Sequence, residues 1–93
     1  MAVETLEKTT TVRKPAPMYR VLLHNDPHNT MEHVIQSIME VVPSISEPQA
    51  VNIMMEAHNN GTGLVVVCAL EPAEFYCECL QSKGLTSTIE PDD

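Results

Sequence analysis

The sequence has few aromatic residues, with no tryptophan, one phenylalanine and two tyrosines. Because 43% of its residues are nevertheless hydrophobic, a folded interior must be built from aliphatic side chains and methionines, whose flexible thioethers fill irregular space. A chain of 93 residues has room for one domain with a modest core. The length therefore excludes an enzyme built from two lobes.

Positive charge is also scarce, with five lysines and arginines against 13 aspartates and glutamates and a net charge of -8. A protein that binds phosphates needs a basic patch, so nucleic acid and membrane surfaces are not expected partners. No apolar run reaches the roughly 18 residues of a membrane span. The opening MAVETLEKTT lacks the apolar centre of a signal peptide. We therefore expect a cytoplasmic protein, or a stromal one if the organism has plastids.

Cysteine is too rare for a disulfide framework. Cys68, Cys77 and Cys79 are odd in number, and the last two lie too close together for an easy bridge, which indicates reduced thiols. Cys68 falls in an apolar run that is typical of a core strand, and nothing in the sequence marks an activated thiolate. A catalytic cysteine is therefore not expected.

Four histidines are present, but their spacing does not predict a metal site. His24 and His28 lie on either side of a turn that contains Pro27, and His33 and His58 fall on different expected helices. The sequence has no glycine-rich phosphate loop. We therefore expect no metal, no cofactor and no catalytic residue, and we keep a zinc hydrolase with ligands His24, His28 and His58 as the enzymatic alternative.

The beginning of the chain is polar and ends in a Pro-Ala-Pro sequence, without the periodicity of a helix or a strand. This pattern predicts a flexible N-terminal extension, 1–17, before a folded core, 18–93. Residues 19–24 are rich in strand formers and are followed by the turn residues Asn25, Asp26 and Pro27. The core is therefore expected to begin with a strand.

Two helices are expected next. Apolar residues recur every three or four positions over 31–42, which is the period of an amphipathic helix. A second helix is predicted over 46–60, because Ser46 and Gln49 form a capping-box pattern. Gly61 supplies its stop.

The remaining segments complete an α+β fold. Residues 64–70 form a continuous β-branched run and are expected to be the central strand, followed by a helix over 71–83 and a short strand over 85–90. The predicted order is β-α-α-β-α-β. Such an order forms a compact three-stranded antiparallel sheet packed against three helices.

Polar acceptors and apolar side chains are predicted to meet at one end of this fold. The first strand ends in Asn25 and Asp26, the first helix begins with Met31, and the second helix presents Met54 and His58 on neighbouring faces. A pocket between these ends would be acidic at its rim and aliphatic inside. Periodicity alone favours a simpler interpretation, in which the methionines are ordinary core and the polar residues cap a turn and a helix end.

Four segments in a fixed order change this balance, because together they resemble the ClpS adaptor family. The similarity extends over residues 18–90 and is closest to the cyanobacterial and plastid branch. Its segments are MYRVLLHND (18–26), TMEHVI (30–35), AVNIMMEAHNNG (50–61) and LTSTIE (85–90).

The resemblance implies the same fold and a function without catalysis. Members of this family bind proteins by a free, bulky N-terminal residue, an N-degron, and deliver them to the N-domain of a Clp AAA+ unfoldase of the ClpC or ClpA type for proteolysis. The implied protein is a monomeric adaptor, and with no transit peptide in the sequence a bacterial cytosol is favoured. The alternative from another class is an assembly module, because the fold is also similar to the C-terminal domain of the ribosomal stalk protein.

The resemblance also implies roles for individual residues. Asn25, Asp26 and His58 would bind the α-amino group of the substrate. Met31 would be the gatekeeper that rejects β-branched residues, and Glu71 would contact the unfoldase, although Tyr76 stands where a lysine often accompanies that glutamate. The pocket for the first side chain would be lined by Leu23, Asn29, Met31, Val34, Met54, Ala57 and Leu85.

Four positions depart from the commoner bacterial pattern. Pro27 replaces a second aspartate, Asn29 a threonine and Thr30 a proline, and Ala57 stands where valine is common. These changes predict a different grip on the amine and a wider pocket or a shifted preference between leucine and aromatic residues.

Overall fold

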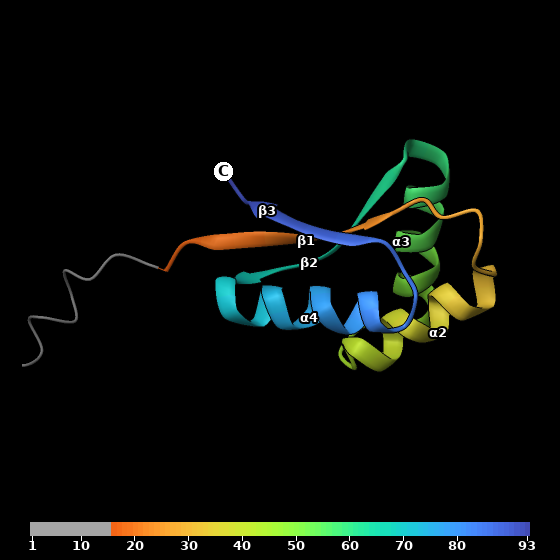
Figure 1. Cartoon of the computed structure of the whole chain (residues 1–93), viewed down its shortest axis with the longest axis horizontal. Helices are drawn as coiled ribbons and strands as arrows, with labels where there is room; N and C mark the ends of the chain where they lie inside the picture. Colours follow the sequence, from red (N-terminus) through yellow and green to blue (C-terminus); the bar gives the residue numbers. More distant parts are fainter. Residues whose placement is uncertain (1–15) are drawn as a thin grey trace, which may run out of the picture.

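The computed structural model describes residues 16–93. Apart from residues 16 and 17, the expected extension 1–17 lies outside the described residues. The predicted α+β order of β-α-α-β-α-β is confirmed, with three antiparallel strands and three helices (Figure 1). The elements are β1 (Met18–His24), α2 (Met31–Val41), α3 (Glu47–Asn60), β2 (Thr62–Ala69), α4 (Leu70–Ser82) and β3 (Ser87–Pro91).

The sheet has the order β2-β1-β3, so β1 is its central strand. The prediction that residues 64–70 form the central strand is therefore wrong, because β2 lies at an edge. The apolar pattern was misleading because β2 has a bulge where it pairs with β1. Val21 pairs with Val66 and Leu22 with Leu64, which leaves Val65 as the extra residue. Val65 is buried, so the continuous apolar run reflects a bulge in an edge strand and not a strand covered on both faces.

The helices cover one face of the sheet (Figure 1). Helix α4 runs along the strands, and α2 and α3 gather near the end at which β1 stops. Along β1, Val21 and Leu23 join the buried core. Arg20 is turned away and pairs with Glu90 of β3 at 3.2 Å, as the alternation of a strand requires.

One hydrophobic cluster holds these layers together. The side chains of Val21, Ile38 and Leu80, from β1, α2 and α4, are completely buried. The cluster contains leucine, isoleucine, valine, alanine and one methionine, Met54, and no fully buried aromatic ring. The expectation of an aliphatic core is confirmed, but methionine contributes less than expected, because Met18, Met31 and Met55 are exposed. Burial of each such side chain contributes about 1.5–3 kcal/mol to folding.

The helix ends follow local capping rules. The Thr30 hydroxyl accepts from the backbone N–H of His33 at the start of α2. At the start of α3, the predicted capping box is present, because Gln49 Oε1 accepts from the Ser46 N–H at 2.8 Å and Gln49 N–H donates back to the Ser46 hydroxyl. Gly61 ends α3 with a φ of +95°, which glycine adopts without the strain of a Cβ atom. Two of these ends, at Thr30 and Gly61, lie next to the cavity described below.

The last strand is shorter than predicted. β3 begins at Ser87, whereas the sequence pattern indicated residue 85. Leu85 instead donates its N–H to Leu80 O at the end of α4, and the Thr86 carbonyl accepts from His24 N at 2.9 Å. The Leu85 side chain is thereby released from the sheet and turned into the cavity.

Candidate functional site

One cavity lies where the end of β1, the 25–30 loop, α3 and the turn between α4 and β3 meet, and its volume is about 240 Å3. All ten residues that were predicted to bind a substrate line it. Those predicted for the amine are Asn25, Asp26 and His58, and those predicted for the side chain are Leu23, Asn29, Met31, Val34, Met54, Ala57 and Leu85.

The interior of the cavity is aliphatic. Leu23, Val34, Met54, Ala57 and Leu85 are all buried and come from β1, α2, α3 and the turn before β3. The i, i+3 spacing of Met54 and Ala57 places both on the same side of α3. An uncharged, branched or flat group would therefore find apolar contact on several sides.

The mouth of the cavity carries Met31, the first residue of α2. Its side chain is 51% exposed, the largest exposed fraction among the methionines of the described residues. An exposed methionine at a helix start is not part of the core, so the simpler interpretation of Met31 as ordinary core is wrong. A flexible thioether at this position can narrow the entrance to different extents.

The polar rim is organised by the carboxylate of Asp26. Its Oδ1 accepts from the His28 backbone N–H at 2.8 Å, in the geometry of an Asx turn, and its Oδ2 accepts from Asn29 Nδ2 at 2.6 Å. The backbone hydrogen bond from His28 is the main cause that lowers the pKa of Asp26, and the side-chain hydrogen bond from Asn29 lowers it further, against a desolvation that raises it. Asp26 is therefore an anion at neutral pH.

The other two rim residues lie beside Asp26 and at the end of α3. The backbone N–H of Asn25 donates to Gly61 O at 2.9 Å, which fastens the loop to the C-cap of α3. His58 lies in the last turn of α3, three residues before Gly61, and is exposed. Asn25, Asp26 and His58 thus line the same cavity, and their amide oxygen, carboxylate and imidazole nitrogen can each accept a hydrogen bond.

Two lining residues were not predicted. His24 ends β1, and its Nε2 lies 2.7 Å from the Thr88 hydroxyl of β3. Pro27 stands in the loop between Asp26 and His28. Their positions next to predicted site residues could have indicated a place at the cavity. Strand alternation, however, puts the side chain of His24 on the face of the sheet opposite to that of Leu23. His24 is nevertheless the last residue of β1 and lines the cavity together with Asn25 and Asp26.

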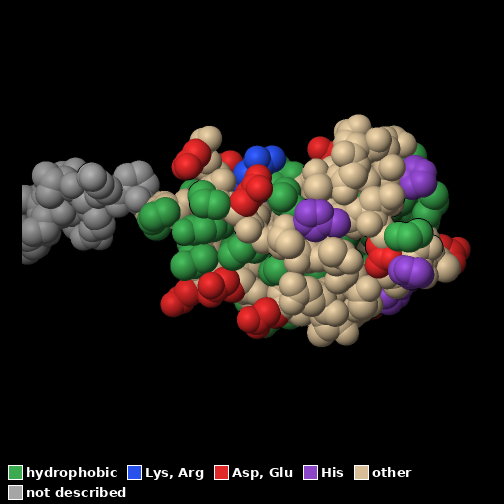
Figure 2. Space-filling view, turned by 45° about the horizontal axis from the view of Figure 1, so that its top comes forward, with side chains coloured by type: hydrophobic (Ala, Val, Ile, Leu, Met, Phe, Trp, Pro, Cys, Tyr) green, Lys and Arg blue, Asp and Glu red, His purple; other side chains and the backbone are tan. Residues whose placement is uncertain are grey.

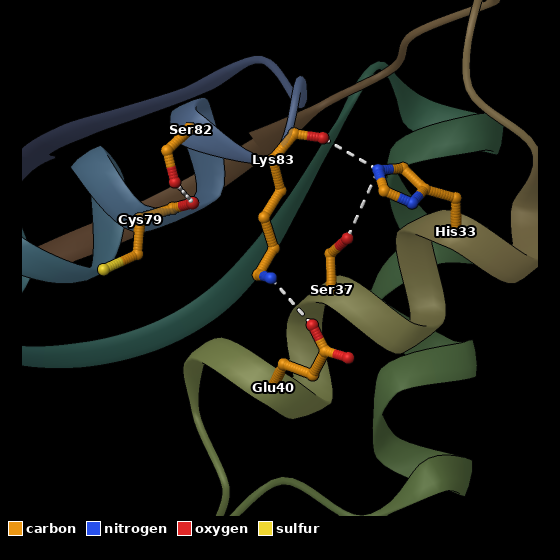
Figure 3. Close-up of polar contacts among 6 residues, drawn as sticks. All are labelled: His33, Ser37, Glu40, Cys79, Ser82 and Lys83. Atoms are coloured by element: carbon orange, nitrogen blue, oxygen red, sulfur yellow. Dashed lines mark hydrogen bonds and ion pairs between the residues drawn. The ribbon is translucent and has the colours of Figure 1, made fainter.

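A second set of polar contacts joins α2 to the end of α4 (Figure 3). His33 Nε2 donates to the Lys83 carbonyl at 2.7 Å, and the Lys83 ammonium pairs with Glu40 at 2.7 Å. The hydrogen bond and the charge of Lys83 lower the pKa of Glu40. These contacts hold the turn that carries Leu85 against α2.

Glu71 lies far from the cavity, at the start of α4 and at the opposite end of that helix from the cavity turn (Figure 1). It borders a groove lined by Ala16, Pro17, Tyr19, Ala69, Leu70, Glu71 and Pro72. Leu70 and Phe75 of α4 are exposed by 40% and 59%. Figure 2 shows apolar side chains gathered at this end of the molecule with acidic ones around them.

The histidines and thiols do not converge on a metal. Within residues 16–93 there is no group of three or more His, Cys, Asp or Glu side chains that could hold an ion, which gives the zinc hydrolase alternative no geometric support. All three cysteines are free thiols, and burial raises the pKa of Cys68. A raised pKa opposes formation of the nucleophilic thiolate. In the same part of the chain, no helix is long and apolar enough to cross a membrane.

Residues 16–93 form a small α+β domain with an amphipathic cavity at one end. The family model described as "ATP-dependent Clp protease adaptor protein ClpS" matches residues 14–88. This chain therefore belongs to the ClpS family of Clp protease adaptors, as the resemblance of its segments indicated.

Individual relatives agree with this assignment. The chain is 67% identical over 95 residues to the ClpS adapter protein of Synechococcus elongatus, with all of both chains covered. It is 51% identical over 80 residues to the chloroplastic CLPS1 of Arabidopsis thaliana, covering 86% of this chain and 50% of that protein. Among solved structures, it matches Agrobacterium tumefaciens ClpS2 bound to L-phenylalaninamide, with a TM-score of 0.76, 32% identity, and coverage of 84% of this chain and 100% of that chain.

Proposed function

We propose that this protein binds proteins that begin with a bulky hydrophobic residue and a free α-amino group, and that it delivers them to a Clp AAA+ unfoldase for degradation. The single observation that carries the proposal is the cavity itself. Residues with hydrogen-bond acceptors and buried aliphatic residues line the same cavity. An N-terminal residue has the matching pair of features, a cationic amine on the same carbon as an apolar side chain.

Recognition of the α-amino group discriminates between substrates more strongly than recognition of the first side chain. A free α-amino group has a pKa of about 7.7–8 and is largely an ammonium with three donors at neutral pH. Asn25, Asp26 and His58 offer an oxygen, a carboxylate and a ring nitrogen to those donors. Acetylation removes the charge and two of the three donors, and a hydrogen bond to a charged group contributes about 1.5–3 kcal/mol.

The first side chain would enter the aliphatic interior past Met31. The L-phenylalaninamide bound by the Agrobacterium tumefaciens ClpS2 is a phenylalanine with a free α-amino group and an amide in place of the next peptide bond. It therefore has the chemistry of an N-terminal residue. The shared fold and the cavity of this chain support the same class of ligand here, and the small Ala57 leaves space for an aromatic ring.

Delivery would use the groove at the other end of α4. Because Glu71 and the exposed Leu70 lie away from the cavity, the N-domain of a ClpC or ClpA type unfoldase could contact them while a substrate occupies the cavity. Ala16 and Pro17, the last two residues of the N-terminal extension, line this groove, and the extension, 1–17, is proposed as the segment that the unfoldase engages. The protein is proposed to act as a monomer, without catalysis, in the cytoplasm of a bacterium.

Peptide binding measured by fluorescence anisotropy tests the proposal. The peptides differ only at residue one, as Leu, Phe, Tyr, Trp or Val, with an acetylated Phe peptide as the control. We expect tight binding of bulky first residues, weak binding of Val and loss of binding on acetylation. Equal binding of the free and acetylated Phe peptides would refute the amine site, and no binding of any peptide would favour the assembly module.

A further inference from the structure

Asn29 occupies an unusual position between the two loops that border the cavity. Its Nδ2 donates to Asp26 Oδ2 at 2.6 Å within the 25–30 loop and to the Gly84 carbonyl at 3.0 Å in the turn between α4 and β3. Asp26 and Gly84, the residues that carry the two acceptors, are 58 positions apart in the sequence. One amide group thus joins both sides of the rim.

The first hydrogen bond determines how the Asp26 carboxylate is turned. The His28 N–H donates to Oδ1 and Asn29 donates to Oδ2. The carboxylate therefore cannot rotate or change rotamer without losing a hydrogen bond. A carboxylate has about four acceptor positions, so two remain for a ligand at the rim. Without Asn29, only the backbone N–H of His28 would hold this group.

The second hydrogen bond determines where the turn lies. Gly84 has a φ of +88°, and the preceding carbonyl, of Lys83, is held from α2 by His33 at 2.7 Å (Figure 3). Two successive carbonyls of the turn are therefore bound by side chains from the opposite wall. Leu85 follows directly and is buried in the cavity, so its place depends on these two contacts.

We propose that Asn29 is a positioning residue, which holds the Asp26 carboxylate and the Gly84–Leu85 turn in register so that amine and side chain are recognised together. The inference rests on the proposed function and assigns Asn29 a role beyond lining the pocket. This role requires two N–H donors on one nitrogen, and the side-chain amide of Asn29 has both. The threonine of the commoner family pattern has a single O–H donor and cannot make both bonds at once.

The test introduces Asn29→Ala both into the wild-type protein and into an Asp26→Ala variant. The measured quantity is the ratio of the affinities for free and acetylated Phe peptides. We expect Asn29→Ala to lower this ratio roughly fivefold, about the effect of one typical hydrogen bond. In an Asp26→Ala background, the same substitution should not lower the ratio further, because the group that Asn29 positions is gone.

Matched variants keep the test independent of folding. Asn52→Ala removes an exposed asparagine of α3 that does not line the cavity and should leave the ratio unchanged. Asn29→Thr keeps one donor and should give a ratio between those of the wild type and Asn29→Ala, and thermal melts confirm that each variant is folded. An unchanged ratio in both Asn29 variants, or an equal loss with and without Asp26, would overturn the inference. If the wild type did not discriminate between the peptides, the proposed function would fail first, and this inference with it.

Discussion

Gly63 of β2 packs directly on the backbone of Ile53 in α3, and a Cβ atom at Gly63 would collide with the Ile53 carbonyl oxygen. The same Cβ would lie 3.2 Å from Ala57 N, closer than ordinary contact. The strand and the helix approach this closely only because Gly63 has no side chain. Ala57 is thereby placed in the wall of the cavity.

We expect Gly63→Ala to lower the free energy of unfolding by about 1–3 kcal/mol, as overpacking of a rigid backbone contact does. Urea denaturation followed by circular dichroism measures the change. Thr62→Ala, at the neighbouring exposed position, is the control and should shift the midpoint far less. Equal midpoints for Gly63→Ala and the wild type would show that α3 moves away without cost.

Asp26→Ala and His58→Ala are each expected to weaken binding of a Phe or Leu peptide by about 1–3 kcal/mol, because each removes an acceptor for the ammonium group. Isothermal titration calorimetry checks both variants. The thermal melt of His58→Ala should stay close to that of the wild type, whereas Asp26→Ala also loses the hydrogen bonds from His28 and Asn29 and is expected to remain folded with a lower melting temperature. Glu32→Ala removes an exposed carboxylate away from the cavity and controls for net charge. Wild-type affinity in both rim variants would contradict the proposed amine site.

Met31→Ala should widen the mouth of the cavity. We expect peptides beginning with Val or Ile to gain affinity relative to Leu, because the exposed thioether no longer meets their β-branch. The ranking is measured by competition against one labelled Leu peptide. Met55→Ala serves as the matched variant, because Met55 is an exposed methionine of α3 that does not line the cavity. An unchanged ranking in Met31→Ala would remove the gatekeeper role.

The ion pair between Glu40 and Lys83 predicts that the stability of the fold depends on pH. The pKa of Glu40 is lower in the folded chain because Lys83 donates to it and carries the opposite charge. Its contribution is therefore fully present above the unfolded value of about 4.3 and is lost as the pH falls through the lower folded value. We expect Glu40→Gln to melt below the wild type at pH 7 and the two melting curves to converge in acid.

The control for this pH dependence is Glu32→Gln, an exposed glutamate on the same helix. Its melting temperatures at pH 7 and in acid measure the effect of removing a carboxylate from α2 that does not pair with Lys83. A difference between Glu40→Gln and the wild type that persisted unchanged into acid would show that the Lys83 pair does not produce it.

Glu71→Ala and Leu70→Ser are expected to weaken binding of the unfoldase N-domain while peptide affinity stays unchanged, because the groove and the cavity lie at opposite ends of α4. Surface plasmon resonance with the immobilised N-domain measures the first quantity and anisotropy the second. Glu78→Ala, another exposed glutamate of α4, is the matched control. Loss of peptide binding together with N-domain binding would indicate unfolding instead of a separate docking surface.

Local features of the fold were readable from the sequence because their causes are local. The capping box of α3 requires only that Ser46 and Gln49 stand three residues apart, and the glycine stop requires only a backbone without a Cβ. The apolar repeat of α2 likewise identified Val34 and Ile38 as buried positions. The ordered segments also identified the family, which single periodicities could not do.

Sheet order and the detailed connections of the site were decided by the tertiary structure. Whether a strand is central depends on which partners lie on its two edges, and the bulge at Val65 made an edge strand resemble a central one. The sequence and its family resemblance named the residues that line the cavity. The hydrogen bond from Asn29 to Asp26 spans only three residues and is local. The bond from Asn29 to Gly84 joins two loops that meet only after folding, since no local rule relates residues 55 positions apart.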